Sequence, residues 1–221
     1  GLFMTGCTGA TTENGGSNAS ESSSASYPMT ISHAYGETVI ESQPERVATI
    51  SWGNQDVPLA LGIVPVGVSK ANYGETDKNG LLPWTGEKYA ELGEEYDLLS
   101  EIAPVLAYPE NAWQTLWRDQ ITMNATALGK KDEGDALVKE LETLISDKTS
   151  KYPDIEGKTA VFCYFNPADL GKFYIYLPSD PRAAYLTDLG FEFPESISEL
   201  AKESDSFSIE VSSENIDVLK D

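Results

Sequence analysis

Histidine and cysteine, the residues that most often bind zinc or take part in nucleophilic catalysis, are scarce in this chain. Its 221 residues include one histidine, His33, and two cysteines, Cys7 and Cys163. A His/Cys zinc site needs about four such ligands, and a Ser-His-Asp triad would depend on His33 alone. The sequence contains no Gly-rich phosphate loop and no metal-binding motif. We therefore expect no enzyme, no catalytic residues, no cofactor and no protein-bound metal.

Aromatic side chains and arginines give the chain the chemistry of a binding site. Aromatic rings offer flat apolar surface at low entropic cost, and guanidinium groups make bidentate contacts with anions. Trp52 follows a predicted parallel strand, at the edge where open α/β sheets place ligands. The other candidates lie in loops, at helix starts or beside a loop of the second half: Tyr73, Trp84, Trp113, Arg118, Tyr176 and Arg182. Arg118 could instead pair with a nearby acid, and Trp117 is expected in the core.

The first residues indicate attachment to a membrane surface. Met4-Thr5-Gly6-Cys7 resembles a bacterial lipobox, in which the cysteine receives diacylglycerol. Residues 8–26 contain no large apolar residue and no positive charge, so they cannot bury a core. We expect residues 1–7 to be the remnant of a lipoprotein signal with a lipidated Cys7. Residues 8–27 are then a flexible polar tether.

Composition excludes several other classes of protein. The chain has 15 Lys and Arg against 36 Asp and Glu, a net charge of −21. Such a charge repels phosphate backbones and gives no basic patch for anionic lipid, so we expect no nucleic-acid partner. No run approaches the roughly 18–20 apolar residues that span a bilayer. We expect contact with the membrane only through the lipid anchor.

The folded part begins with a predicted hairpin around Tyr35-Gly36, followed by a βαβ unit. Its strands are predicted over residues 46–51 and 63–68, with a helix over residues 55–61 between them. A βαβ unit implies parallel strands and an α/β class. Residues 72–95 are rich in Gly, Pro, Trp and charge and are predicted to be loop, and residues 112–128 to be helical.

A long amphipathic helix, capped by Asp132, is predicted to reach about Lys151. A second α/β half follows, with strands over residues 159–165 and 173–177 and a helix over residues 181–189. Residues 195–205 are predicted to be solvated acidic surface, and a last helix begins near Ser213.

Several local segments, in this order, resemble the substrate-binding lipoproteins of iron–siderophore ABC transporters. The likeness covers roughly residues 27–221. It is carried by residues 30–38, 43–48, 60–68, 96–109, 177–182 and 186–190. The resemblance implies two Rossmann-like lobes, at residues 28–130 and 153–221, joined by one long helix at residues 131–152. It also implies a monomer on the extracellular face of the cell membrane, or in the periplasm.

In this family a ferric siderophore lies in the cleft between the lobes, and the loaded protein docks on an ABC permease. The resemblance makes the seven aromatic and arginine candidates ligand-binding residues. It makes Glu214, in Ser212-Ser213-Glu214, the permease-docking glutamate of the second lobe. Glu214 could equally be an ordinary acid in the first turn of a helix.

Two departures from the family pattern concern the completeness of the cleft. A strand–helix unit that the family carries before Tyr96 is missing, and the second lobe is incomplete at Asp221. A transport-incompetent surface fragment therefore stays an alternative function. Haem or cobalamin stays an alternative ligand, because both use aromatic clefts and neither strictly requires a histidine. A site for free zinc or manganese is disfavoured because His33 is the single histidine.

Overall fold

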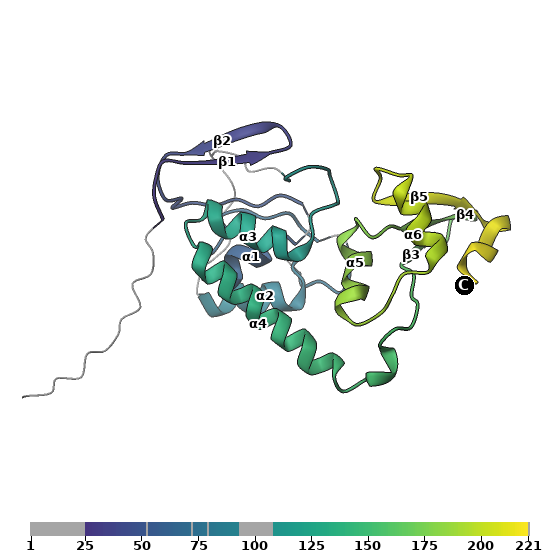
Figure 1. Ribbon diagram of the computed structural model, residues 1–221. Helices are drawn as coiled ribbons and strands as arrows, with labels where there is room; N and C mark the ends of the chain where they lie inside the picture. Colours follow the sequence, from purple (N-terminus) through teal and green to yellow (C-terminus); the bar gives the residue numbers. More distant parts are fainter. Residues whose placement is uncertain (1–24, 52, 72, 79, 93–107, 221) are drawn as a thin grey trace, which may run out of the picture.

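The computed structural model describes residues 25–51, 53–71, 73–78, 80–92 and 108–220. Figure 1 shows two lobes side by side, with one long helix running from the first lobe toward the second. Mixed helix and sheet confirm the expected α/β class. Among the described residues, no helix is both long enough and apolar enough to cross a bilayer.

The described part of the N-terminal lobe contains a hairpin, a short parallel pairing and three helices. Strands β1 (Met29–His33) and β2 (Gly36–Ile40) pair antiparallel, which confirms the predicted hairpin. The two predicted parallel strands meet in one parallel bridge between Ala48 and Gly67. The helices are α1 (Asp56–Ala60), α2 (Pro83–Leu92) and α3 (Trp117–Ala127).

The prediction of loop over residues 72–95 is wrong for its second half, which forms α2. Tyr89 of this helix is buried in a cluster with Leu59, Val68 and Leu81, and its hydroxyl donates to the carbonyl of Pro65 (3.2 Å). Packing of one helical face outweighs the weak intrinsic helix preference of this Gly- and Pro-containing stretch.

The connecting helix α4 (Lys131–Thr149) confirms the predicted long helix, although its start differs. Lys130 occupies the cap position and makes no side-chain cap bond, so Asp132 lies in the first turn instead. An acid in the first turn still interacts favourably with the helix dipole.

The second lobe is built on an antiparallel sheet of β3 (Cys163–Asn166), β4 (Asp169–Tyr176) and β5 (Ser208–Ser212), in the order β3-β4-β5. Phe173 and Ile175 of β4, together with Leu177 directly after it, form the buried core of this lobe. The surrounding helices are η1 (Pro153–Ile155), α5 (Pro181–Asp188), α6 (Glu195–Lys202) and η2 (Ser213–Leu219).

Residues 195–205 are not merely acidic surface, as their sequence suggested. They include α6, whose Ile197 is fully buried and whose Leu200 packs on the core cluster around Phe173. The last predicted helix is the 3₁₀ helix η2, interrupted at Asn215. The start of the strand predicted at residues 159–165 is reduced to a parallel bridge between Thr159 and Glu192.

The turn between α3 and α4 packs Gly129 closely against the side chain of Tyr27. Gly129 adopts φ +69°, and a Cβ there would lie 2.3 Å from the buried hydroxyl of Tyr27. We expect Gly129→Ala to lower the free energy of unfolding by about 2 kcal/mol, because the left-handed backbone penalty adds to the steric clash. Urea denaturation measures this change. The control is Gly157→Ala, which has φ +75° and open space at the Cβ position. Its expected cost is about 1 kcal/mol, and equal costs for the two variants would contradict the clash.

Candidate functional site

Arg182, at the start of α5, is held by a carboxylate with no solvent exposure. Asp180 is 0% exposed and caps the helix, accepting from the backbone N–H groups of Arg182 (2.8 Å) and Ala183 (3.3 Å). The Arg182 guanidinium donates to the same carboxylate through Nε (3.0 Å) and Nη2 (2.6 Å). These bonds raise the pKa of Arg182 above its usual range. Its charge and orientation are therefore fixed before any ligand arrives.

Two aromatic rings from separate segments lie beside this arginine, and a third ring packs on one of them. The Arg182 guanidinium carbon lies 4.3 Å from the ring centre of Tyr176 and 5.9 Å from that of Phe207. Tyr176 stacks on Phe207 at 5.9 Å and makes a tilted contact with Phe162 at 5.4 Å. The second lobe thus presents a cation beside flat apolar faces, which suits a large ligand with oxygen acceptors and apolar arms.

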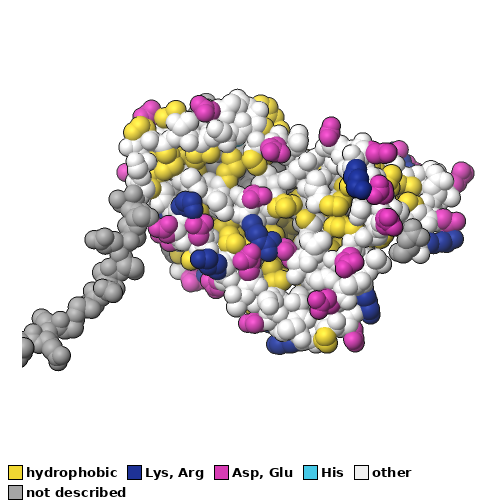
Figure 2. All heavy atoms as spheres, viewed as in Figure 1, with side chains coloured by type: hydrophobic (Ala, Val, Ile, Leu, Met, Phe, Trp, Pro, Cys, Tyr) yellow, Lys and Arg dark blue, Asp and Glu magenta, His cyan; other side chains and the backbone are white. Residues whose placement is uncertain are grey.

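A groove of about 420 Å³ opens beside this cluster. Its walls come from α3, from the segment before β3 and from the first turns of α5, and they consist of Trp117, Phe162, Pro181, Arg182 and Tyr185. Figure 2 shows hydrophobic side chains gathered where the two lobes meet. The expectation that Trp117 belongs to the core is therefore wrong, because it is half-buried and forms a groove wall.

A second cavity, of about 410 Å³, lies on the other side of Trp117 and Tyr185. It runs along the apolar stripe of α4, and its lining adds Val57, Gln120, Ile121, Leu141, Leu144, Ile145, Lys148 and Leu189. This cavity is mainly aliphatic, whereas the groove at Arg182 combines aromatic faces with a cation.

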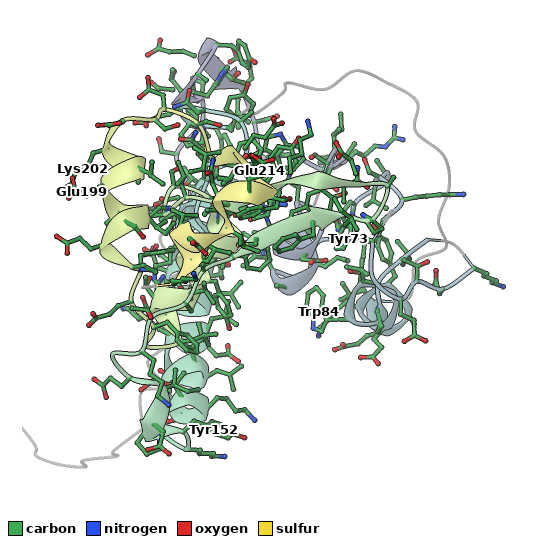
Figure 3. The ribbon with its side chains drawn as sticks, turned by 90° about the vertical axis from the view of Figure 1, so that its right-hand side faces the viewer. Tyr73, Trp84, Tyr152, Glu199, Lys202 and Glu214 are labelled. Atoms are coloured by element: carbon green, nitrogen blue, oxygen red, sulfur yellow. The ribbon has the colours of Figure 1, made fainter. Side chains whose placement is uncertain are left out.

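Tyr73 and Trp84 come from neighbouring segments of the N-terminal lobe. Trp84 is 42% exposed in the first turn of α2. Beside it, the Thr85 hydroxyl donates to Asp56 (2.9 Å), tying α2 to α1. Burial raises the pKa of the Asp56 carboxyl, and burial together with the Asp56 charge raises the pKa of Tyr73. Figure 3 shows Tyr73 and Trp84 on the same side of the molecule, apart from Glu214.

Trp113 lies in the segment that leads into α3 and is 46% exposed. Its φ of +64° is unusual for a residue with a side chain and is maintained at a cost of about 1 kcal/mol or more. The next residue, Gln114, donates its amide to the carbonyl of Asp205 (2.7 Å) in the second lobe. This bond brings the Trp113 segment to the segment that carries Phe207.

Arg118 engages two carboxylates, as one reading of the sequence anticipated. Its Nε lies 2.7 Å from Glu142 of α4, and its Nη1 lies 2.9 Å from Asp188 of α5. These bonds, the one to Glu142 first, raise the pKa of Arg118. A direct role in ligand binding stays a prediction for this residue.

Two further predicted residues, Trp52 and Cys7, lie outside the described residues. Glu214 is exposed in the first turn of η2, where its backbone N–H donates to the Ser212 hydroxyl (3.4 Å). Its side chain is accessible to a partner.

Sequence reasoning missed Phe162, Phe207, Tyr185 and Asp180. Of these, Asp180 was detectable, because Asp-Pro-Arg at a helix start is typical of an N-cap followed by proline at N1. The three aromatics lie in segments with no local signal for binding. Only the pairing of strands brings Phe162, Tyr176 and Phe207 together.

The chain is similar in sequence and fold to several known proteins. A family model described as "Periplasmic binding protein" matches residues 85–219. The crystal structure of PiaA from Streptococcus pneumoniae TIGR4, in complex with ferrichrome, is 44% identical with a TM-score of 0.79. That match covers 87% of this chain and 76% of the solved chain. The probable siderophore-binding lipoprotein YfiY of Bacillus subtilis (strain 168) is 29% identical over 89% of this chain and 69% of its own length. SirA of Staphylococcus aureus, complexed with staphyloferrin B, shares the fold at 23% identity over 85% of this chain and 72% of that chain, with a TM-score of 0.63.

Proposed function

Because this chain belongs to the periplasmic binding protein family, we propose that it captures a ferric hydroxamate siderophore of the ferrichrome type and delivers it to an ABC permease. The family consists of solute-binding proteins rather than enzymes, in agreement with the sequence-based expectation. The observation that carries the proposal is the anchored Arg182 among Tyr176, Phe162 and Phe207, in a chain 44% identical to a protein crystallised with ferrichrome.

The chemistry of a ferric hydroxamate fits these groups. The iron is enclosed by oxygen atoms of the chelator, so the protein meets hydroxamate oxygens, amides and short apolar arms rather than the metal. Arg182 donates N–H groups to such oxygens, and the aromatic rings cover the apolar arms. Trp52, Tyr73, Trp84 and Trp113 supply further flat faces in the proposal. Arg118, whose guanidinium lies 4.3 Å from the ring centre of the groove wall Trp117, supplies a second cation in the proposal.

The proposal places the protein at the outer surface of the cell membrane. Cys7 carries the lipid anchor, residues 8–27 span the distance to the folded part, and the protein acts as a monomer. Glu214 meets a basic residue of the permease, which its exposure and the acidic net charge of −21 support. A curated relative named as a lipoprotein supports the anchor.

Tryptophan fluorescence tests the proposed ligand. We expect ferrichrome to quench the emission saturably, because the chain has four tryptophans and one of them, Trp117, lines the groove. Ferric catecholate, haem and cobalamin are the comparison ligands. Saturable quenching by haem or cobalamin alone would replace the ferrichrome assignment, and no response from a folded sample would identify a transport-incompetent surface fragment.

Arg182→Lys tests the role of the arginine in that binding. We expect about tenfold weaker ferrichrome affinity, because lysine keeps the charge but loses the planar, bidentate and stacking contacts. Fluorescence titration measures the dissociation constant. Arg46→Lys is the matched control, since Arg46 is exposed and lines neither the groove nor the second cavity. Equal affinities for Arg182→Lys and wild type would remove Arg182 from the site.

A further inference from the structure

The carboxylate of Asp188 joins α5 directly to α3 and is connected to α4 through Arg118. It is the last residue of α5 in the second lobe, and its side chain is 16% exposed. The indole N–H of Trp117 donates to it at 2.8 Å from α3 of the first lobe. The Arg118 guanidinium, also on α3, lies 2.9 Å away and pairs in addition with Glu142 of α4. Asp188, Trp117, Arg118 and Glu142 thus link the first lobe, the connecting helix and the second lobe.

The position of Asp188 in its helix is unfavourable by itself. A negative charge in the last turn of a helix opposes the helix dipole, so this carboxylate relies on groups outside α5. Among the described contacts, those groups are the indole N–H and guanidinium of α3. Both are charged or strongly polar donors, and the Arg118 guanidinium lies 4.3 Å above the Trp117 ring. The indole is therefore held at its nitrogen and along one face.

What Asp188 holds in place is a wall of the groove. The Trp117 ring lines the groove together with Arg182 and Tyr185 of α5. Asp188 is in the same helix as these two residues and lies about 1.7 turns after Arg182. One carboxylate thus fixes the rotamer of the first-lobe wall and the distance from that wall to the second-lobe cation.

We propose that Asp188 is a positioning residue that preforms the binding groove, by fixing the Trp117 indole and by joining α5 to α3 across the two lobes. This inference rests on the proposed function for the identity of the ligand, but its geometric part does not depend on any ligand. A preformed groove lowers the ordering cost of binding, so its loss weakens affinity without removing any contact between Asp188 and the ligand.

Four variants separate positioning from a general loss of stability. Asp188→Ala removes both contacts, whereas Asp188→Asn keeps an oxygen acceptor for the indole and removes the charge that Arg118 needs. Trp117→Phe keeps a ring in the wall and removes its N–H donor. Glu142→Gln is the matched control, because it weakens the other ion pair of Arg118 without touching Trp117.

Ferrichrome titration of the full chain gives the first readout. We expect about tenfold weaker affinity for Asp188→Ala and a smaller loss for Asp188→Asn, with unchanged affinity for Glu142→Gln. The double variant Trp117→Phe and Asp188→Ala is expected to bind ferrichrome no more weakly than the weaker-binding single variant. Both changes break the same hydrogen bond between the Trp117 indole and Asp188. Wild-type affinity in Asp188→Ala, or an equal loss in Glu142→Gln, would overturn the proposal.

A ligand-independent readout separates this inference from the proposed function. We expect amide hydrogen exchange in α5 to be at least tenfold faster in Asp188→Ala than in wild type or Glu142→Gln, with the near-ultraviolet circular dichroism of tryptophan altered as well. If wild type binds no siderophore but the amides of α5 exchange faster in Asp188→Ala, the proposed function fails and the positioning role of Asp188 is supported. If exchange in α5 is unchanged, the positioning role fails whatever the ligand is.

Discussion

Replacing Asp180 by alanine is expected to lower the free energy of unfolding by about 3–4 kcal/mol, as for other buried ion pairs that lose one partner. The carboxylate is 0% exposed and accepts from two backbone N–H groups and from the Arg182 guanidinium. Its loss leaves the first turn of α5 uncapped, which by itself costs about 1 kcal/mol. It also leaves Arg182 with a buried edge and no counter-charge.

Chemical denaturation of Asp180→Ala and wild type measures this cost. Asp135→Ala is the control, since Asp135 makes an exposed ion pair with Lys131 in α4 at 2.7 Å. Such pairs contribute little, so we expect a change below about 0.5 kcal/mol there. Asp180→Asn keeps an acceptor oxygen for the helix cap. We expect its loss of unfolding free energy to lie between those of Asp180→Ala and Asp135→Ala. If Asp180→Ala lowers the free energy of unfolding no more than Asp135→Ala does, then Asp180 does not stabilise the start of α5 through its cap and its ion pair with Arg182.

Gly134→Ala is expected to destabilise the protein by about 3 kcal/mol, although alanine is the better helix former. Gly134 is buried in α4, and a Cβ there would lie 2.4 Å from the Cβ of Ala125 in α3. Carbon atoms pack at about 3.5–4.0 Å, so the two helices would have to separate by roughly 1 Å or more. Neither Cβ can rotate away. The gain of about 1 kcal/mol in helix preference is smaller than this overpacking cost.

A double mutant tests whether the close helix contact causes the loss. Ala125→Gly removes the opposing Cβ, so the pair Gly134→Ala and Ala125→Gly is expected to recover most of the stability lost in Gly134→Ala. Thermal unfolding of the four proteins in the cycle gives the coupling between the two sites. Additive effects in the cycle would show that the cost arises elsewhere than at the contact between α3 and α4.

An anchored arginine also explains how a strongly acidic chain can hold a ligand rich in oxygen atoms. The net charge is −21, yet Arg182 is surrounded by Asp180 and aromatic rings. Screening over about 8–10 Å limits the influence of more distant surface acids. The local site, rather than the total charge, therefore decides which ligands can approach the groove.

The sequence predicted those elements whose signals are local. The hairpin from Met29 to Ile40 follows from β-prone runs on either side of Tyr35-Gly36, and α4 follows from its apolar spacing. The start of α5 is marked by Asp180 and Pro181, because capping involves only neighbouring residues. Tyr176 and Arg182 were placed beside the same loop, and they lie in contact.

The tertiary structure decided what depends on distant partners. The segment before Leu92 is helical because Tyr89 finds a buried cluster made by other segments, and α6 forms because Ile197 packs on the second-lobe sheet. Phe162 and Phe207 lie near Arg182 because backbone hydrogen bonds pair their segments with the end of β4. Such long-range pairing cannot be recognised in local composition.

The same distinction separates the binding residues from those that support them. The scarcity of histidine and cysteine favoured a binding protein over an enzyme or a zinc protein, and the family match supports that expectation. Only the folded chain determined that Arg118 pairs with Asp188 and Glu142, and that Trp117 forms a wall of the groove. The physical reason is that these contacts join residues 24 to 71 positions apart in the chain, and such proximity is set by the packing of whole helices.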